Sequence, residues 1–396
     1  MRTVGTVSRG VRLPIVKQGE DLVKVVTDSI VEMGKEQRLT FHEKDVVAVT
    51  ESVVARVQGN YVSIDDIAAD AKAKFGTDTI GIIFPILSRN RIAICLRGFA
   101  KAFKKVYMLM SYPSDEVGNH LFDEDLLDEK GVNPYSDVLD EKQYRDLFGY
   151  VKHQFTGVDY IEYYRELFNA EDCDIEFIFA NDCRAILNYT KNVLCCDIHT
   201  RERSRRRLTK AGAEKVLTMA DIMNSPVNGS GYNEKYGLYG SNKATEDTVK
   251  LFPRDCQHFV DALQKSLEDA TGVKMNCMIY GDGAFKDPVG KIWELADPVV
   301  SPAYTERLSG TPNELKLKYL ADNDFSDLKG EALVEAMKDA IRKKEGSLVG
   351  NMASEGTTPR QLTDLLGSLS DLTSGSGDKG TPVVFIQGYF DTYAEQ

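Results

Sequence analysis

The sequence predicts a protein of the mixed α/β class, in which strands and helices alternate. Mostly apolar segments of strand length, such as residues 45–49 and 106–110, alternate with segments whose apolar residues recur at helical spacing. The 396 residues suffice for a large core and predict two or three domains. Hydrophobic residues make up 42% and charged residues 28% of the chain, which is ordinary for a globular protein.

The first third of the chain shows this alternation most clearly. After Gly19, apolar residues at helical spacing predict a helix that ends near Gly34. Ser63, with Asp66 three residues later, predicts the N-cap of a second helix, which reaches Phe75. The predicted strands are residues 45–49 and 106–110. Residues 52–56 either continue the first of these strands or start another element.

The middle and last thirds continue the pattern with longer interruptions. Residues 123–130 are acidic and predict a loop, and residues 224–243, rich in Gly, Asn, Ser and Tyr, predict a long loop of the functional or disordered kind. The predicted helices are residues 144–168, 258–270, 328–344 and 359–372. The predicted strands are residues 175–180, 193–198, 276–280, 292–296 and 383–386.

Composition argues against several classes of protein. A net charge of −12 disfavours a nucleic-acid-binding surface, because neutralising many phosphates needs a basic face. No apolar run approaches the roughly 20 residues of a membrane helix, and the first residues lack the apolar segment of a signal peptide. The seven cysteines are spaced too irregularly for a disulfide framework. These observations predict a cytoplasmic protein without a membrane or nucleic-acid partner.

A glycine-rich segment near the C-terminus is a candidate phosphate-binding loop. Gly375, Gly377 and Gly380 allow backbone N–H groups to approach phosphates closely, and Lys379 adds a positive charge. The segment follows a predicted helix and precedes a predicted strand, so it is not a Walker A motif. A flexible connector is the competing interpretation.

Asp282 is a candidate metal ligand. It lies between two glycines at the end of the apolar segment 276–280, where α/β sheets place their ligands. Carboxylates suit Mg²⁺, which bridges to nucleotide phosphates. A tight Gly-Asp-Gly turn without a ligand explains the same residues.

Polar residues beside two N-terminal apolar segments are further candidates for phosphate binding. Lys17 follows the segment Leu13-Pro14-Ile15, and Glu51, Ser52 and Arg56 follow the predicted strand at 45–49. A cation and a hydroxyl just past a buried strand can hold phosphate groups. Solvated surface charge is the competing interpretation for each of them.

Three other clusters favour structural roles. Cys195 and Cys196 are adjacent, so a strand points them to opposite faces, and no second Cys or His pair lies at zinc spacing. Residues 201–207 carry five arginines and predict a solvated helix start, with substrate binding left open. The five histidines show no catalytic spacing.

Four segments, taken in order, resemble the gamma-glutamyl ligases that act on the deazaflavin coenzyme F420-0. The first motif of that family is a Leu-Pro segment followed by a Lys and the start of a helix, and the second is an apolar strand followed by a hydroxyl and a cation. The third motif is a metal-binding Asp at the end of a strand. The fourth is a helix followed by a Gly-rich loop and the final strand. The corresponding segments here are residues 11–22, 45–59, 280–283 and 365–388. The resemblance implies a ligase-like core formed by residues 1–125 and 251–396, with residues 126–250 as a central insertion or subdomain.

The resemblance implies a metal-dependent ligase driven by a nucleoside triphosphate of the GTP type. The terminal phosphate would pass to a substrate carboxylate, and the amino group of glutamate would attack the acyl phosphate to form a gamma-glutamyl-type amide. The implied partners are the nucleotide, glutamate and a small carboxylate acceptor. The implied cofactors are Mg²⁺ or Mn²⁺, with K⁺ as a further candidate, and the implied assembly is a homodimer.

The resemblance also assigns individual residues. Those assigned to nucleotide binding are Leu13, Pro14, Ile15, Ser52, Arg56, Asn119, Gly375, Gly377, Lys379 and Gly380. Those assigned to metal binding are Asp115, Asp282 and Asp378. The family has an acidic ligand where this chain has Ser376, with Asp378 as a substitute, and a Lys where this chain has Arg56. These departures leave open a nucleotide-binding protein of the same fold without ligase activity, and a metal-dependent phosphohydrolase.

Overall fold

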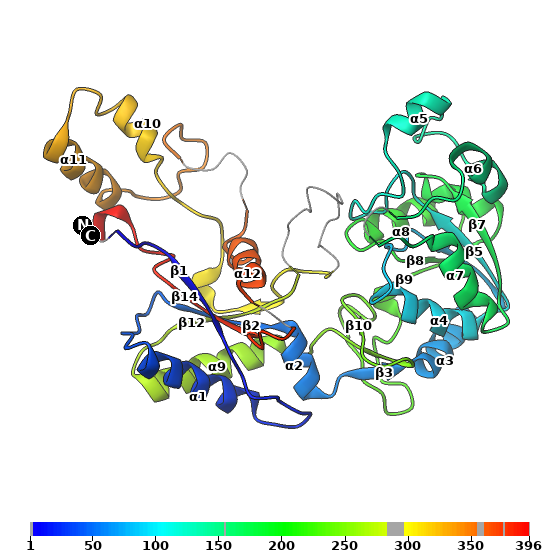
Figure 1. Cartoon of the computed structure of the whole chain (residues 1–396), viewed down its shortest axis with the longest axis horizontal. Coiled ribbons are helices and arrows are strands. Elements are labelled where there is room, and N and C mark those ends of the chain that lie inside the picture. Colours follow the sequence, from blue (N-terminus) through cyan, green and yellow to red (C-terminus); the bar gives the residue numbers. More distant parts are fainter. Residues whose placement is uncertain (1–2, 154–155, 283–296, 355–359, 375–376, 396) are drawn as a thin grey trace.

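The chain folds into two large lobes and a small helical module (Figure 1). The computed structural model describes residues 3–153, 156–282, 297–354, 360–374 and 377–395. The chain begins in the first lobe, crosses to the second lobe at β3 (Tyr61–Ser63), and returns after β11 (Thr248–Lys250). Helices and strands alternate in both lobes, so the predicted mixed α/β class is confirmed.

The first lobe is built on a five-stranded mixed sheet, which we name sheet A. Across sheet A the strands are β1 (Val7–Val11), β14 (Val383–Gln387), β2 (Val46–Thr50), β12 (Asn276–Tyr280) and β13 (Ala303–Tyr304). One face packs against α1 (Leu22–Glu36) and α9 (Cys256–Thr271), and the other packs against α12 (Leu362–Thr373). Central strands covered on both faces are apolar throughout, which explains the unbroken apolar run at 46–49.

One end of sheet A collects segments that are far apart in the sequence. Val383 of β14 pairs with Val11 of β1 on one side and with Val49 of β2 on the other. Thr50, which follows Val49, pairs with Tyr280 of β12. The ladder between β2 and β12 is the only parallel one in the described part of sheet A. The last residues of β1, β2 and β12 and the first residue of β14 therefore lie in one row. We name this row the carboxyl end of sheet A. The segments that extend from it are residues 12–16, 51–56, 281–282 and 377–382.

The second lobe is built on a six-stranded sheet, which we name sheet C. Across sheet C the strands are β6 (Leu139–Asp140), β7 (Asp174–Phe179), β5 (Lys105–Met110), β4 (Thr79–Ile83), β8 (Asn192–Cys195) and β9 (Lys215–Thr218). All neighbouring strands are parallel except β6 and β7. From β4 the chain moves through β5 to β7 on one side, whereas β8 and β9 lie on the other. The strand order therefore reverses between β4 and β8.

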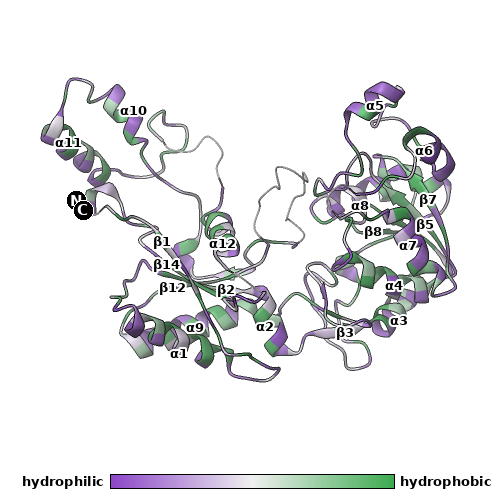
Figure 2. Cartoon of the chain, viewed as in Figure 1, coloured by the Kyte–Doolittle hydropathy of each residue, from purple (hydrophilic) through white to green (hydrophobic). Residues whose placement is uncertain are grey.

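Helices cover both faces of sheet C. On one face lie α3 (Ile64–Phe75), α4 (Ile92–Ala102) and α7 (Tyr160–Asn169). On the other face lie the short helix η1 (Cys183–Asn188) and α8 (Arg201–Lys210). The outer helices α5 (Asp125–Lys130) and α6 (Glu141–Phe148) are largely hydrophilic (Figure 2).

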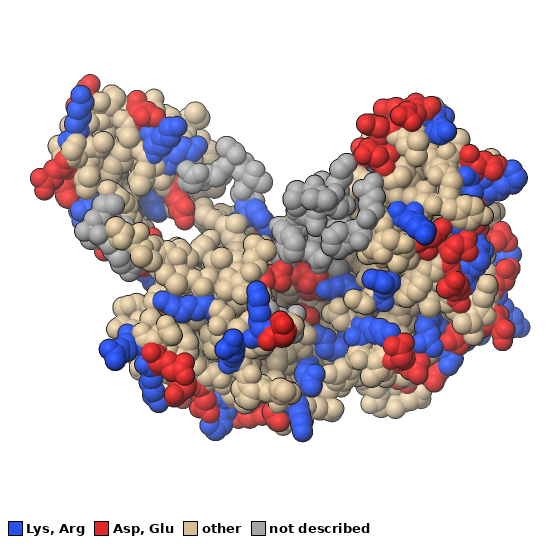
Figure 3. Space-filling model, in the orientation of Figure 1, with Lys and Arg blue, Asp and Glu red and all other residues tan. Residues whose placement is uncertain are grey.

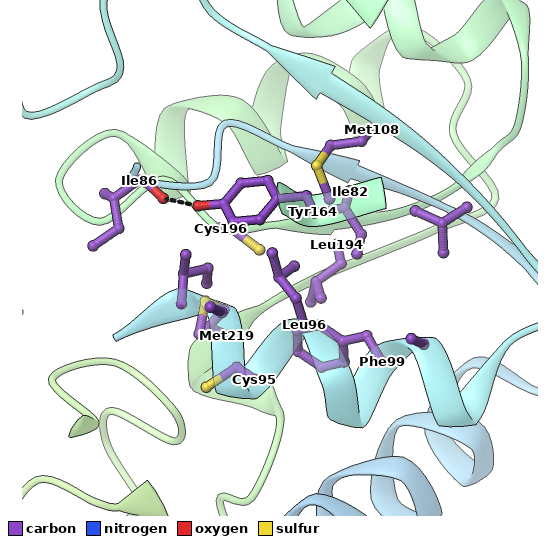
Figure 4. Packing of buried hydrophobic residues seen from close by; sticks show 14 of the residues in the cluster. Ile82, Ile86, Cys95, Leu96, Phe99, Met108, Tyr164, Leu194, Cys196 and Met219 are labelled. Carbon is purple, nitrogen blue, oxygen red and sulfur yellow. Dashed lines mark hydrogen bonds between the residues drawn. The ribbon is translucent and has the colours of Figure 1, made fainter. Parts of the chain in front are cut away.

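The main core of the second lobe lies between sheet C and α4. Figure 4 shows Leu96 and Phe99 of α4 beneath the side chains of the sheet, with the hydroxyl of Tyr164 donating to the carbonyl oxygen of Ile86 at 2.9 Å. Cys196 faces this core, whereas Cys195 belongs to the cluster on the opposite face. The predicted opposite orientation of the two adjacent cysteines is confirmed, and both are buried.

Smaller units complete the structure. Sheet B consists of β10 (Asn242–Lys243), β11 and β3, and it packs on the core of the second lobe. Helix α2 (Glu51–Gln58) leads from β2 toward β3. The helical module contains α10 (Leu317–Asp322) and α11 (Gly330–Arg342) around a small apolar cluster. In the described part of the chain, no helix combines the length and apolar character needed to cross a membrane.

Most predicted elements are confirmed, including the Ser63–Asp66 capping box at the start of α3. Of the two alternatives for residues 52–56, a separate element is confirmed, because they lie within α2. Two predictions were wrong in detail. Residues 123–130 contain α5 rather than only a loop, since Leu127 packs into the core. Residues 144–168 form two helices, because the positive φ of Gly149 (74°) ends α6. The strand predicted at 292–296 lies outside the described residues.

The long loop at 224–243 is irregular, as predicted, except for β10 at its end. It is nevertheless anchored to the second lobe. Leu238 and Tyr239 are buried in the core, and the side-chain amide of Asn233 donates to the carbonyl oxygens of Phe252 and Pro253, each at 3.1 Å. This segment is therefore part of the packed structure rather than a free loop.

The division of the chain at residues 125 and 250 stays a prediction. Sheet C takes β4 and β5 from one side of residue 125 and its other strands from the far side. The lobe that contains residues 126–250 thus also contains residues from β3 onward.

Gly98 sets how closely α3 and α4 pack. A Cβ atom there would lie 2.6 Å from Cγ2 of Ile67 and 3.2 Å from the carbonyl oxygen of Ile64. Helix propensity alone favours Gly98→Ala by about 1 kcal/mol, but overpacking a tight core costs about 1–3 kcal/mol. We expect Gly98→Ala to lower the free energy of unfolding measured in urea. Lys101→Ala, which removes only an exposed ion pair with Asp65 of α3, is the control and should cost less than about 1 kcal/mol. A Gly98→Ala variant as stable as the wild type would contradict the close packing.

Candidate functional site

Charged side chains from both lobes meet at the carboxyl end of sheet A. Arg91, just before α4, lies between Asp282, which follows β12, and Asp297. Its Nη1 is 2.9 Å from Oδ1 of Asp297, and its Nη2 donates to Oδ2 of Asp282. The backbone N–H of Asp282 donates to Oδ2 of Asp297 at 2.7 Å. Figure 3 shows acidic and basic atoms side by side between the lobes. One guanidinium group thus holds two carboxylates together and joins the lobes.

A second ion pair lies beside the first. Lys250, at the end of β11, places Nζ 2.6 Å from Oγ of Ser52 and 3.5 Å from Oε1 of Glu51. Glu51 is 5% exposed and Lys250 is 7% exposed. Oε2 of Glu51 has no hydrogen-bond partner in the described structure. Glu51 and Ser52 begin α2, so the turn from β2 into that helix positions both side chains.

The electrostatics of this cluster follow from its burial. Burial raises the pKa of Glu51 to about 7, and Asp297 adds to this effect, while Lys250 and Arg91 oppose it. Burial alone would lower the pKa of Arg91, but Asp282, Asp297 and Glu51 raise it, and the net shift is upward. Arg91 therefore stays charged at every physiological pH, whereas Glu51 titrates near neutrality.

The segments predicted to bind phosphates are in contact with one another at the same end of the sheet. The backbone N–H of Leu13 donates to the carbonyl oxygen of Gly380 at 3.3 Å. Nε of Arg56 donates to the carbonyl oxygen of Val16 at 2.9 Å, which ties α2 to the Leu-Pro segment. The N–H of Thr50 donates to the carbonyl oxygen of Pro382 at 2.9 Å. Residues from three of the four motifs are therefore in direct contact, and Asp282 follows the adjacent strand.

The remaining residues of these motifs differ in environment. Pro14 is exposed, and the side chain of Ile15 is 85% exposed. A Cβ atom at Gly377 would meet no atom within 4 Å, so nothing in the protein approaches that glycine closely. Gly380 has a φ of 64°, which favours glycine. Asp378 and Lys379 lie in the same turn, whereas Gly375 and Ser376 lie outside the described residues.

Asp115 and Asn119 lie in the second lobe, on the loop after β5. The carboxylate of Asp115 accepts hydrogen bonds from the N–H groups of Leu87 (2.8 Å), Asn119 (2.7 Å) and Val117 (3.2 Å), and from the Asn119 side chain (2.7 Å). Burial raises the pKa of Asp115 to about 6, and these hydrogen bonds oppose the shift. Both oxygens are thus engaged by the chain, and among the described residues no three His, Cys, Asp or Glu side chains are grouped to hold a metal.

A cavity of about 400 Å³ opens at the carboxyl ends of the strands of sheet C. Its walls include Phe84 after β4, Ser111 after β5, Asn181 after β7 and Thr200 after β8. Open α/β sheets bind ligands at this end, near the point where the strand order reverses. The described lining contains neither Lys nor Arg, and of its three carboxylates those of Asp115 and Glu116 already accept hydrogen bonds from the chain, which leaves Glu124.

The loop after β4 connects this cavity to the charged cluster. Leu87 donates to Asp115 at the cavity, and Arg91 reaches Asp282 and Asp297. On the far side, the carboxylate of Glu116 accepts hydrogen bonds from the N–H groups of residues 198–200, just before α8. The cavity and the carboxyl end of sheet A therefore share one connecting loop.

The arginines at the start of α8 have structural partners. Arg205 pairs with Asp221, Arg207 pairs with Asp182 at 2.9 Å, and Arg201 lies 4.8 Å from the ring centroid of Tyr239. These contacts support the structural interpretation of residues 201–207.

Sequence reasoning missed three residues of the cluster and named Glu51 only together with Ser52 and Arg56, as a candidate for phosphate binding. Lys250 had a signal, because it is a lone cation within the apolar segment 249–252. Asp297 also had one, since it directly follows the apolar segment predicted as a strand. Arg91 had none, because the helix that it precedes was not predicted.

Removal of Arg91 should destabilise the protein strongly. Arg91→Met leaves the carboxylates of Asp282 and Asp297 without their shared cation, and breaking a buried ion pair costs about 3–5 kcal/mol. We expect a loss of about 3 kcal/mol in urea unfolding, partly recovered by adding Asp282→Asn and Asp297→Asn. The control Lys142→Met breaks an exposed pair with Asp146 and should cost less than about 1 kcal/mol. Equal losses in the two single variants would show that Arg91 does not join the lobes.

Comparison with models of protein families gives a match over nearly the whole chain. The family model described as F420-0:Gamma-glutamyl ligase matches residues 10–388. The matched range includes residues 126–250, for which the resemblance in sequence offered no counterpart. A search of curated proteins gives no match.

Proposed function

Because the chain belongs to the F420-0:gamma-glutamyl ligase family, we propose that it forms a gamma-glutamyl-type amide in a metal-dependent reaction driven by GTP or a related nucleotide. The terminal phosphoryl group passes to an acceptor carboxylate, and the amino group of glutamate then displaces phosphate. The observation that carries this proposal is the convergence of four distant motifs at the carboxyl end of sheet A.

The site offers what phosphoryl transfer requires. Such a reaction depends on positioned phosphates and on cations that neutralise developing charge, without a nucleophilic side chain. The segment 377–382 contacts Leu13 and Thr50 near the end of β2, and the Ser52 hydroxyl and the cations of Lys250 and Arg56 lie in the helix and strand beside it. We place the nucleotide phosphates among these groups.

The carboxylates beside Arg91 fit a divalent cation. Asp282 and Asp297 already share one positive group, the guanidinium of Arg91. Mg²⁺ prefers oxygen ligands and is commonly held by one or two carboxylates together with substrate phosphates. Asp282 and Asp297 would hold the cation, and its charge would offset that of the transferred phosphoryl group. Asp115 and Asp378 stay predicted ligands, the former with both oxygens engaged in this structure.

We place the acceptor in the cavity at the carboxyl ends of sheet C. The cavity is connected to the charged cluster through the loop after β4, and its size suits a small molecule. The Glu124 carboxylate and the hydroxyls of its lining favour an acceptor that carries hydrogen-bond donors away from its reacting carboxyl group.

Ligase activity can be tested by the release of nucleoside diphosphate. We expect release from GTP and Mg²⁺ to depend on both a carboxylate acceptor and glutamate, because the acyl phosphate is consumed by the amine. A phosphohydrolase would release diphosphate without either substrate, and a binding protein would release none. Release that is independent of glutamate across a broad acceptor panel would refute the ligase proposal.

Asp282→Asn tests the metal site while keeping the shape of the side chain. We expect the variant to lose the Mg²⁺-dependent part of nucleotide binding, because the amide lacks the charge that holds the cation. In a thermal-shift assay the wild type should gain about 2.7 kcal/mol at a hundredfold excess of nucleotide over Kd. Asp261→Asn, on the exposed side of α9, is the control. An unchanged Mg²⁺-dependent shift in Asp282→Asn would exclude Asp282 from the site.

The homodimer expected from the resemblance is a separate prediction. Light scattering at micromolar protein concentration should give about twice the chain mass of 44.2 kDa. A mass equal to that of one chain would show that the protein works as a monomer.

A further inference from the structure

We propose that Glu51 is the general base of amide formation, which takes a proton from the ammonium group of glutamate before its nitrogen attacks the acyl phosphate. This inference rests on the proposed ligase function and adds a catalytic residue to it. Neither the sequence motifs nor the family match assigns a base to this step.

The position of Glu51 suits this role. It directly follows Thr50, which pairs with Tyr280, and Asp282 lies two residues beyond Tyr280. Its neighbour Ser52 is among the groups that surround the proposed phosphate position. Glu51 therefore lies at the carboxyl end of sheet A, beside the place where an acyl phosphate would form.

The hydrogen bonding of Glu51 distinguishes it from the other carboxylates of the cluster. Asp282 and Asp297 both bind the guanidinium of Arg91, and Asp115 accepts four hydrogen bonds from its own chain. In Glu51, Oε1 faces Lys250 at 3.5 Å, but Oε2 is buried without a partner in the described structure. A buried acceptor without a donor calls for an explanation, and an incoming ammonium group supplies the missing donor.

Two other buried carboxylates also have an unpartnered oxygen, but they lie elsewhere. Asp45 precedes β2 at the opposite end of that strand, and Asp197 follows β8 in the second lobe. Neither contacts a segment that the proposed function places around the phosphates. Among the described carboxylates, the free oxygen at the carboxyl end of sheet A belongs to Glu51.

The surroundings of Glu51 tune it for proton transfer near neutrality. The groups that act on it are Lys250 and Arg91, which favour its ionised form, and Asp297, which opposes it; Cys256 and Tyr280 lie close and are neutral at pH 7. Burial outweighs the cations and raises its pKa to about 7. A base of this strength both accepts a proton from an ammonium group and releases it to water at the end of the cycle.

The proposed step balances in atoms and charge. One proton moves from the ammonium group to Oε2 of Glu51, which leaves a neutral amine. The nitrogen lone pair then forms the C–N bond at the acyl carbon, and the C–O bond to phosphate breaks. Phosphate leaves with the electron pair of that bond and with the second proton of the nitrogen. Lys250 acts as a positioning residue, since its contacts with Glu51 and Ser52 fix the carboxyl group beside the phosphates.

Hydroxylamine separates this step from the one before it. Hydroxylamine is uncharged at pH 7, so it attacks an acyl phosphate without the help of a base and yields a hydroxamate. In Glu51→Gln, which keeps the shape of the side chain, we expect glutamate amide formation to fall about 10²–10⁴-fold. Hydroxamate formation with hydroxylamine in place of glutamate should stay within about threefold, because no base is needed. Glu268→Gln, on the exposed side of α9, is the matched control and should change neither rate.

The pH profile supplies a readout that a structural role would not change. In the wild type, kcat/KM for glutamate should rise with pH and level off once Glu51 is ionised. In Glu51→Gln it should keep rising as the substrate ammonium itself deprotonates. If Glu51→Gln does not fold, Glu51→Asp decides the question, since a shortened base should slow amide formation while hydroxamate formation persists.

Three results would overturn the inference. Amide formation at the wild-type rate in Glu51→Gln would show that Glu51 is not the base. Equal loss of amide and hydroxamate would assign Glu51 to phosphate binding or to the fold. Failure of the wild type to form hydroxamate with any acceptor would instead count against the acyl phosphate, and so against the proposed function itself.

Discussion

The parallel pairing of β2 with β12 is the contact on which the site depends. These two strands come from opposite ends of the chain, yet their register places Thr50 beside Tyr280. Because both strands run in the same direction, the residues that follow them emerge together: Glu51 and Ser52 from one, Asp282 from the other. The antiparallel β14 brings the glycine-rich segment to the same row, since its first residue, Val383, pairs with Val49. Loss of this register would scatter every group that the proposed chemistry uses.

Charge compensation limits how this arrangement can vary. The cluster contains three carboxylates, those of Glu51, Asp282 and Asp297, and two cations, those of Arg91 and Lys250. Removing charges from water is costly, so such a group persists only when opposite charges and hydrogen bonds are well matched. Burial, to which the carboxylate of Asp297 adds, raises the pKa of one member, Glu51, to about 7. A bound cation or substrate ammonium would change this balance, which links occupancy of the site to the protonation of Glu51.

Most strands and helices of the fold could be predicted from the sequence, but most residues of the charged cluster could not. The buried strands 45–49 and 276–280 could be predicted because strands covered on both faces are apolar throughout, and Asp282 stood out at the end of one of them. Arg91 and Lys250 could not be placed, because their role depends on the contact between two lobes, and no local pattern encodes such a contact. The helix α4 escaped prediction since it is apolar on nearly every side, as buried helices are. Asp115 illustrates the opposite case, a residue marked by motif whose oxygens prove to be occupied by its own loop.

The two places where the chain passes between the lobes lie side by side. β3 and β11 pair with each other in sheet B, and the N–H of Leu251 donates to the carbonyl oxygen of Asn60 at 2.8 Å. The ribbon is part of the second lobe, because Val62 of β3 and Val249 of β11 are buried in its core. Its end also reaches the first lobe, since Lys250 of β11 contacts Glu51 and Ser52. One strand therefore both returns the chain to the first lobe and supplies a cation to the charged cluster, so a shift in the register of sheet B would move Lys250 away from the proposed phosphate position.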